Sequence, residues 1–205
     1  MTKIKICGIT NIEDAMFCSL SGVDALGFIF YEKSPRYIDA GKAKEICSRL
    51  PPFVTKVGVF VNEDEKRLRD IFYFSGLNVV QLHGGESVNY VYNLKALLPG
   101  VHIIKFVRNM NEAELFATVV NSFIVDSGGG TGKVCDWKFA RNLREKISLP
   151  LILAGGLDER NVRKAIETVR PYAVDACSKL EKEKGKKDNG KLEEFIREVR
   201  NSEIA

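Results

Sequence analysis

Short apolar stretches alternate with helical patterns along the whole 205-residue chain, and this alternation most constrains the fold. Strands that alternate with helices across short connections form a parallel sheet. Eight such units in a chain of this length predict an α/β fold, a closed eight-stranded parallel (β/α)8 (TIM) barrel, in one domain covering residues 1–205. We expect the strands at about residues 3–7, 24–30, 54–61, 79–82, 101–107, 123–126, 151–154 and 172–176.

Capping residues, glycines and prolines mark the helices between these strands. Thr10 or Asn11 is expected to cap the first helix, and Gly76 to close the third. The Lys- and Glu-rich segment 179–191 is interpreted as a solvated loop with a short helix. We expect helices at about residues 10–20, 39–50, 64–75, 86–98, 111–120, 136–147, 158–169 and 188–199.

The stretch 123–137 is typical of an α/β active site, because Asp126 ends a strand and a loop with four glycines follows. Such an aspartate can also be only a cap or turn former. The pair Gly132-Lys133 is similar to the end of a P-loop, which requires Gly-x-x-x-x-Gly-Lys-Ser/Thr. Here Ser127 stands at the first glycine and Val134 at the hydroxyl position, so we reject the P-loop interpretation.

Composition and charge limit the remaining function classes. The net charge of +4 is modest and partly concentrated in one late run, which gives no support for a nucleic-acid partner. No apolar stretch is long enough to span a bilayer, and the N-terminus is too polar for a signal peptide. Five widely spaced cysteines predict neither a disulfide framework nor a metal site. We expect a reduced, cytoplasmic enzyme without a membrane partner.

Functional groups of a (β/α)8 barrel lie just after its strands, at the C-terminal face. Two of the candidates, the thiol of Cys7 and the carboxylate of Asp126, could form an acid–base pair. A cysteine on a strand can equally be an inert small hydrophobe, and His83 is interpreted as structural rather than catalytic. Asp175 could face either a ligand or a polar neighbour. The candidates are Cys7, Arg36, His83, Arg108, Asp126, Gly155, Gly156 and Ser178.

Six motifs, in order from the first strand to the eighth, resemble those of the phosphoribosylanthranilate isomerase family of tryptophan biosynthesis. The motifs are K-I-C-G-I-T, S-P-R-Y, V-G-V-F-V-N, Q-L-H-G, G-G-T-G-K-x-x-D-W and L-A-G-G-L. The resemblance implies a (β/α)8 barrel without cofactor or metal. It also implies an Amadori rearrangement of N-(5-phosphoribosyl)anthranilate to 1-(2-carboxyphenylamino)-1-deoxyribulose 5-phosphate.

The resemblance assigns roles to single residues. Cys7 would be the base that removes the proton from C2 of the sugar, and Asp126 the acid that protonates the ring oxygen. An acid must hold its proton near neutral pH, and a thiol with a pKa of about 8.5 needs that pKa lowered. Arg36 would hold the anthranilate carboxylate, which suits a planar bidentate donor.

The expected phosphate site lies after the seventh and eighth strands, where Gly155 and Gly156 supply backbone N–H groups. Ser178 and Lys179 follow the eighth strand and would complete it. The family commonly reads D-x-S-S-G-x-E here, whereas this chain has Cys177 in place of a serine and Lys179 in place of glycine. Either Lys179 adds a positive charge to the phosphate site and offsets the lost serine hydroxyl, or the altered loop binds phosphate less well.

Two alternatives stay open. A related aldose–ketose isomerase of the histidine-biosynthesis type would use aspartates as both base and acid, against which Cys7 argues. A barrel that only binds a phosphorylated metabolite would need no acid–base pair. The partner expected under every interpretation is a small molecule, and the chain is expected to be a monomer or a homodimer.

Overall fold

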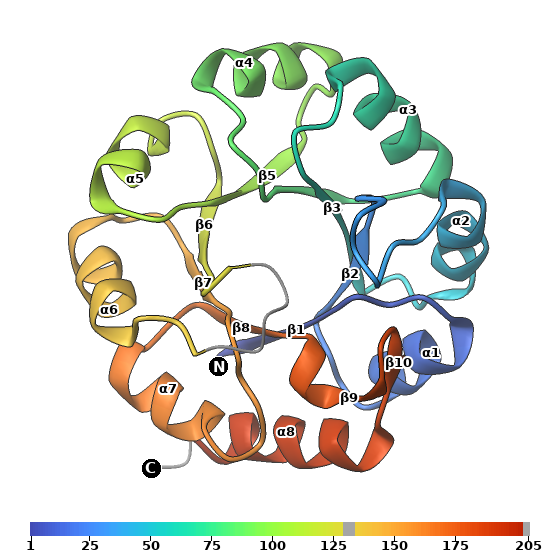
Figure 1. The fold of residues 1–205 in the computed structure, drawn as a ribbon, viewed down its shortest axis with the longest axis vertical. Coiled ribbons are helices and arrows are strands. Elements are labelled where there is room, and N and C mark those ends of the chain that lie inside the picture. The colour runs from blue at the N-terminus through green and yellow to red at the C-terminus, as the bar shows by residue number, and fades with distance from the viewer. Residues whose placement is uncertain (129–133, 203–205) are drawn as a thin grey trace.

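The computed structural model describes residues 1–128 and 134–202, and within them eight parallel strands close into a barrel in chain order (Figure 1). The predicted (β/α)8 fold is therefore confirmed. Each strand lies within one or two residues of its predicted position. The strands are β1 (Lys3–Cys7), β2 (Ala25–Ile29), β3 (Thr55–Phe60), β4 (Val79–Leu82), β5 (His102–Phe106), β6 (Ser122–Val125), β7 (Leu151–Leu153) and β8 (Ala173–Ala176).

Helices form a ring outside the barrel, one after each strand (Figure 1). Asn11 caps the first of them and Gly76 closes the third, as predicted. The seventh begins four residues later than predicted, because Asp158 accepts hydrogen bonds from the N–H groups of Arg160 and Asn161 in a turn. The helices are α1 (Ile12–Leu20), α2 (Ala40–Arg49), α3 (Glu65–Ser75), α4 (Val88–Leu97), α5 (Met110–Phe116), α6 (Trp137–Lys146), α7 (Val162–Val169) and α8 (Asn189–Asn201).

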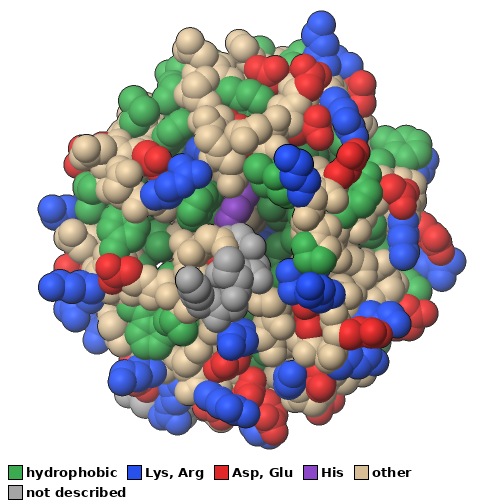
Figure 2. Space-filling view, in the orientation of Figure 1, with side chains coloured by type: hydrophobic (Ala, Val, Ile, Leu, Met, Phe, Trp, Pro, Cys, Tyr) green, Lys and Arg blue, Asp and Glu red, His purple; other side chains and the backbone are tan. Residues whose placement is uncertain are grey.

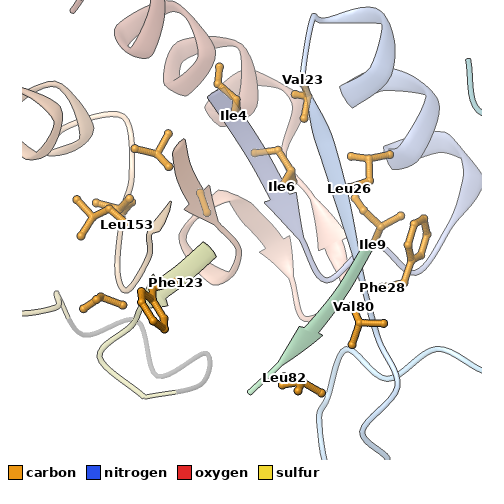
Figure 3. Packing of buried hydrophobic residues seen from close by; sticks show 14 of the residues in the cluster. Ile4, Ile6, Ile9, Val23, Leu26, Phe28, Val80, Leu82, Phe123 and Leu153 are labelled. Carbon is orange, nitrogen blue, oxygen red and sulfur yellow. The ribbon is translucent and has the colours of Figure 1, made fainter. Parts of the chain in front are cut away.

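Alternate residues of each strand point to opposite faces of the barrel wall. The larger apolar cluster joins the outer face of the strands to the helices, and includes Ile4 and Ile6 of β1 (Figure 3). A smaller cluster fills the barrel interior, with Val57 and Ile124 among its members. Buried apolar side chains on both faces stabilise the wall, which leaves its carboxyl ends as a rigid frame for a site.

The segment after β8 contains the short helix that the sequence predicted, but a hairpin stands where the solvated loop was expected. It forms a short 3-10 helix (Ser178–Leu180) and a hairpin of β9 (Glu181–Glu183) and β10 (Lys186–Lys187), which lies beside β1 and α1 (Figure 1). Glu181 and Lys187 are buried despite the polar composition, since they form an ion pair of 3.2 Å with each other. No helix in the described ranges is long and apolar enough to cross a membrane.

Candidate active site

A pocket of about 860 Å³ opens at the carboxyl ends of the strands. Figure 2 shows the hollow near the centre of this face, with a histidine side chain inside it. The lining brings together every site residue that the sequence predicted. These residues are Cys7, Arg36, His83, Arg108, Asp126, Gly155, Gly156, Asp175, Ser178 and Lys179.

Cys7 ends β1, and its thiol is buried at the floor of the pocket. Gly27 of β2 lies directly across the sheet from it. A Cβ atom at Gly27 would stand 2.6 Å from the Cys7 Sγ, closer than real Cβ contacts allow. The Cys7 thiol therefore occupies space that is open only because residue 27 has no side chain.

If Cys7 is the base that the family resemblance implies, Gly27→Ala should displace its thiol and lower kcat by at least about tenfold, because a misplaced reacting group loses its orientation. Gly58→Ala is the matched control, since its Cβ would stand 2.6 Å from the Leu77 Cδ1, in the core. Both variants should lose thermal stability. Only Gly27→Ala should lose more activity than its folded fraction explains, and this loss should be in kcat rather than in KM. Equal specific activity of the two folded variants would contradict this role.

The Cys7 and Cys177 thiols both line the pocket and interact with each other. This contact and burial raise the pKa of Cys7 well above its usual value. The same contact, helped by the nearby Lys187 ammonium and opposed by burial, lowers the pKa of Cys177 to about 7. Two coupled thiols lose their protons as a pair, so one proton leaves this pair near neutral pH.

Lys5 and Asp175, each two residues before one of these cysteines, form a buried ion pair with 2.7 Å between Nζ and Oδ2. Burial raises the pKa of Asp175 to about 7, although Lys5 opposes the shift. Burial acts against the charge of Lys5, but Asp175 and the Cys7 thiol outweigh it and raise the pKa of Lys5. Asp175 lines the pocket and also accepts a hydrogen bond from Lys5. Its position therefore fits both alternatives from the sequence, a residue that faces a ligand and a residue that faces a polar neighbour.

Asp126 follows β6 and meets a histidine that sequence reasoning treated as structural. The Nε2 atom of His83 lies 3.3 Å from the Asp126 Oδ2. The amide nitrogen of Gln81 lies 3.1 Å from Nδ1 of the same ring, and the ring stacks on Phe106 with centroids 4.5 Å apart. With Gln81 donating to Nδ1, the imidazole presents Nε2–H to the carboxylate and fixes its orientation.

Arg36, on the loop after β2, is buried and forms a bidentate pair with Glu181, with both N–O distances 2.8 Å. The ammonium of Lys187 lies 3.2 Å from the same carboxylate and donates to the backbone oxygen of Cys7 at 2.7 Å. The interaction with Arg36 and Lys187 lowers the pKa of Glu181 although burial opposes it. This network connects the hairpin to the tip of β1, and sequence reasoning missed both Glu181 and Lys187.

Gly155 and Gly156, after β7, both adopt left-handed backbone conformations, with φ of 85° and 64°. A side chain at Gly155 would clash with the backbone nitrogen of Ser127 at 2.8 Å. Within residues 1–128 and 134–202, the N–H groups of Gly155, Gly156 and Ser178 donate to no acceptor. These donors, with Lys179 beside them in the lining, suit an anionic group at this end of the pocket.

The glycine loop predicted from residue 128 onward lies partly outside the described residues, because 129–133 are not among them. Its first glycine, Gly128, has a φ of 113°, which favours glycine. Asp136 caps α6 as expected, accepting from the N–H groups of Lys138 and Phe139. Among the residues described, no group of three or more His, Cys, Asp or Glu side chains could hold a metal ion.

The fold and the pocket define a (β/α)8-barrel enzyme in which a buried thiol and a carboxylate from distant strands face one small-molecule site. Residues 4–198 match the family model described as N-(5'-phosphoribosyl)anthranilate (PRA) isomerase. The chain belongs to this family, and its activity is the isomerisation of phosphoribosylanthranilate in tryptophan biosynthesis.

Individual relatives agree with the family match. N-(5'-phosphoribosyl)anthranilate isomerase from Thermotoga neapolitana is 46% identical over 98% of this chain and 99% of its own length. A crystal structure of phosphoribosylanthranilate isomerase with reduced 1-(o-carboxyphenylamino)-1-deoxyribulose 5-phosphate superposes with a TM-score of 0.85, at 40% identity, covering 98% of this chain and all of the other. Monomers derived from the dimeric Thermotoga maritima enzyme give a TM-score of 0.85 at 38% identity, covering 98% and 100%.

Proposed function

We propose that Cys7 and Asp126 are the base and the acid of the isomerisation. The supporting observation is their placement: both line one pocket, from β1 and from the end of β6, which are not neighbours in the barrel. A substrate between them would meet the two groups from different sides. His83 supports the acid role, since it holds one oxygen of Asp126 in a fixed orientation.

In the proposed reaction, Asp126 gives a proton to the ring oxygen of the sugar, so that the ring opens to a Schiff base. Cys7, as a thiolate, then removes the proton from C2, and the electron pair forms the enolamine. Tautomerisation of the enolamine gives the ketose. Proton transfer by a positioned side chain contributes about 10² to 10⁴ in rate, which is the effect each of these two groups should supply.

We place the phosphate of the substrate against Gly155, Gly156, Ser178 and Lys179, whose N–H groups and ammonium face the same end of the pocket. The compound bound in the related crystal structure carries both a 5-phosphate and a carboxyphenyl group. Arg36 would hold the carboxylate through the Nη1 side of its guanidinium, because Glu181 takes Nε and Nη2. Asp175 would contact the sugar from the barrel floor.

Arg36→Met should raise KM strongly, because charge-assisted hydrogen bonds contribute about 1.5–3 kcal/mol each. Steady-state kinetics with phosphoribosylanthranilate and with an analogue that lacks the carboxylate measure the effect. The loss should be much smaller for the analogue. Glu181→Gln keeps Arg36 and removes only its orienting charge, so its KM should rise less. An equal loss with both compounds would show that Arg36 serves only the buried network.

The activity itself is tested by following the fluorescence of phosphoribosylanthranilate during incubation with purified protein. Turnover gives a progressive loss of the signal, whereas a protein that only binds the compound gives a single shift. Complementation of a tryptophan auxotroph that lacks this isomerase tests the same activity in a cell. If the protein failed both the fluorescence assay and the complementation test, a barrel that only binds the compound would be the better interpretation.

We further propose that residues 1–205 act as one domain, in the cytoplasm, on a small-molecule substrate. The chain is expected to be a monomer or a homodimer, and one of its structural relatives comes from a dimeric enzyme. Sedimentation of the purified protein distinguishes the two states.

A further inference from the structure

The residue that follows His83 is tied to a buried ion pair outside the barrel wall. The Nζ atom of Lys105 lies 2.7 Å from the Glu86 Oε2 and donates to the backbone oxygen of Gly84 at 2.8 Å. The N–H group of Gly84 donates to both carboxylate oxygens of Glu86, at 3.1 Å each. One lysine and one glutamate therefore hold both backbone polar groups of Gly84.

A second contact extends this hold to the loop after β3. The backbone N–H of Asn62 donates to the Glu86 Oε1 at 2.9 Å, and its side-chain oxygen accepts from the N–H of Gly85 at 2.7 Å. Residue 84 must be glycine here, since a Cβ atom would stand 2.7 Å from the Glu86 Oε1. The loop after β4 is thus held against the neighbouring loop by directed hydrogen bonds.

Strand β5 supports the loop from both faces of the barrel wall. Lys105 lies on the outer face, with its ammonium 5.5 Å from the centre of the Phe116 ring of α5. The next residue, Phe106, lies on the inner face and stacks on the His83 ring. Because neighbouring residues of a strand point to opposite faces, one strand fixes the backbone at Gly84 and the imidazole at His83.

We propose that Lys105 and Glu86 are positioning residues for the isomerisation: they fix the peptide of Gly84 from outside the barrel and thereby hold His83 against Asp126. This inference rests on the proposed role of Asp126 as the acid. A buried ion pair often adds little stability, because the loss of hydration offsets the attraction of the charges. Here the pair supplies directed contacts that keep the contact of 3.3 Å between the His83 and Asp126 side chains in place.

The combined substitution Lys105→Met with Glu86→Gln tests the inference. It removes both charges without leaving one buried alone, and glutamine keeps an oxygen for the N–H group of Gly84. The backbone oxygen of Gly84 loses its donor. We expect kcat to fall by about 10- to 100-fold with KM changed by less than about twofold, because a shift of about 1 Å in a reacting group has an effect of this size. Steady-state kinetics on the folded protein measure both constants.

The same substitutions in a His83→Ala background show whether the ion pair acts through His83. Residues that act through one another have effects that do not add. His83→Ala should lower kcat by itself, and adding Lys105→Met with Glu86→Gln should lower it by less than about threefold more. Multiplication of the two losses would overturn the inference, since the ion pair would then act by another route.

The His83 ring gives a spectroscopic readout that a general loss of stability would not move. The chain has two histidines, and the other, His102, is exposed at the start of β5, so it serves as an internal reference. Above about pH 8, where an ordinary imidazole is neutral, nitrogen NMR distinguishes the two tautomers. His83 should be in the Nε2–H form in the wild-type protein and a mixture of both forms in Lys105→Met with Glu86→Gln.

Two further variants keep the test decisive. Ile103→Ala removes a buried side chain from the outer face of the same strand, so it should lose stability but keep kcat and the His83 tautomer. Asn62→Gly removes only the contact with the N–H of Gly85, at a residue whose φ of 51° suits glycine. It should lower kcat by about threefold, and it decides the question if the combined variant does not fold.

An unchanged kcat in the folded combined variant, or in Asn62→Gly where that variant decides, would overturn the inference, as would a lost kcat with an unchanged His83 tautomer. Asp126→Asn separates this result from a failure of the proposed acid. If Asp126→Asn keeps its kcat, the acid assignment is wrong. If it loses kcat while Lys105→Met with Glu86→Gln does not, only the positioning role of the ion pair is contradicted.

Discussion

Cys7→Ser is expected to keep the fold and lower kcat by about 10² to 10⁴, the range that one acid–base group contributes. A serine hydroxyl remains protonated at every pH where the protein is folded, and so it is a far weaker base than a thiolate. The change of sulfur to oxygen is small, and no side chain at Gly27 crowds the new hydroxyl. Binding of the substrate should change little, because the phosphate and carboxylate contacts proposed above do not involve this residue.

Cys47→Ser is the matched control for this substitution. Cys47 is buried to a similar degree, with 4% exposure against 6% for Cys7, but lies in the helix layer. The control should lose comparable thermal stability and keep its kcat. If Cys7→Ser stays within a few-fold of wild type, Cys7 has no part in the chemistry.

The wild-type acidic limb gives a second check on the base. The Cys177 thiol and burial raise the pKa of Cys7 well above its usual value, so with Cys7 as the base kcat/KM should still rise with pH above neutrality. In Cys7→Ser this dependence on pH should disappear. A limb that survives unchanged in the variant would belong to another group.

Asp126→Asn is expected to lower kcat by about 10² to 10⁴ while KM changes little. Asparagine matches aspartate in shape and can still accept from the Nε2–H of His83, but it has no proton to deliver to the ring oxygen. The rise of kcat/KM with pH that depends on Cys7 should remain.

The alternative role for Asp126, as a turn former before the glycine loop, makes the opposite prediction. Asparagine serves nearly as well as aspartate in caps and turns, so kcat would barely change. Asp64→Asn provides the control, since Asp64 caps α3 through the N–H groups of Lys66 and Arg67, outside the pocket lining. It should leave kinetics unchanged at a small cost in stability.

The barrel and the ends of its strands could be predicted from the sequence because both depend on local patterns. Alternation of apolar stretches with capped helices gave strands within one or two residues of their positions. Functional groups of this fold lie just after the strands. The sequence therefore predicted that Cys7, Asp126 and Gly155 share one site, without any knowledge of their contacts, and all three line the pocket. Their roles came from the family resemblance, since a thiol or a carboxylate at a strand end has several possible uses.

The partners of these residues could not be predicted, because they depend on contacts between distant parts of the chain. Arg36 and Glu181 are 145 positions apart, and nothing local identifies them as a pair. The polar composition of residues 179–191 favoured a solvated loop, yet the opposite charges of Glu181 and Lys187 allow both to be buried together. Nothing in the sequence around His83 indicated its contact with Asp126. Cys177 was noted only because it replaces a serine of the family at the expected phosphate site.

The kinetic isotope effect of a substrate deuterated at C2 of the sugar tests the division of roles most directly. If Cys7 breaks the C2–H bond and Asp126 opens the ring, Cys7→Ser should make C–H cleavage the slow step and show a full primary effect on kcat. Asp126→Asn should make ring opening the slow step, and its isotope effect should approach one. Isotope effects of equal size in the two variants, or their reversal, would contradict the assignment of base and acid.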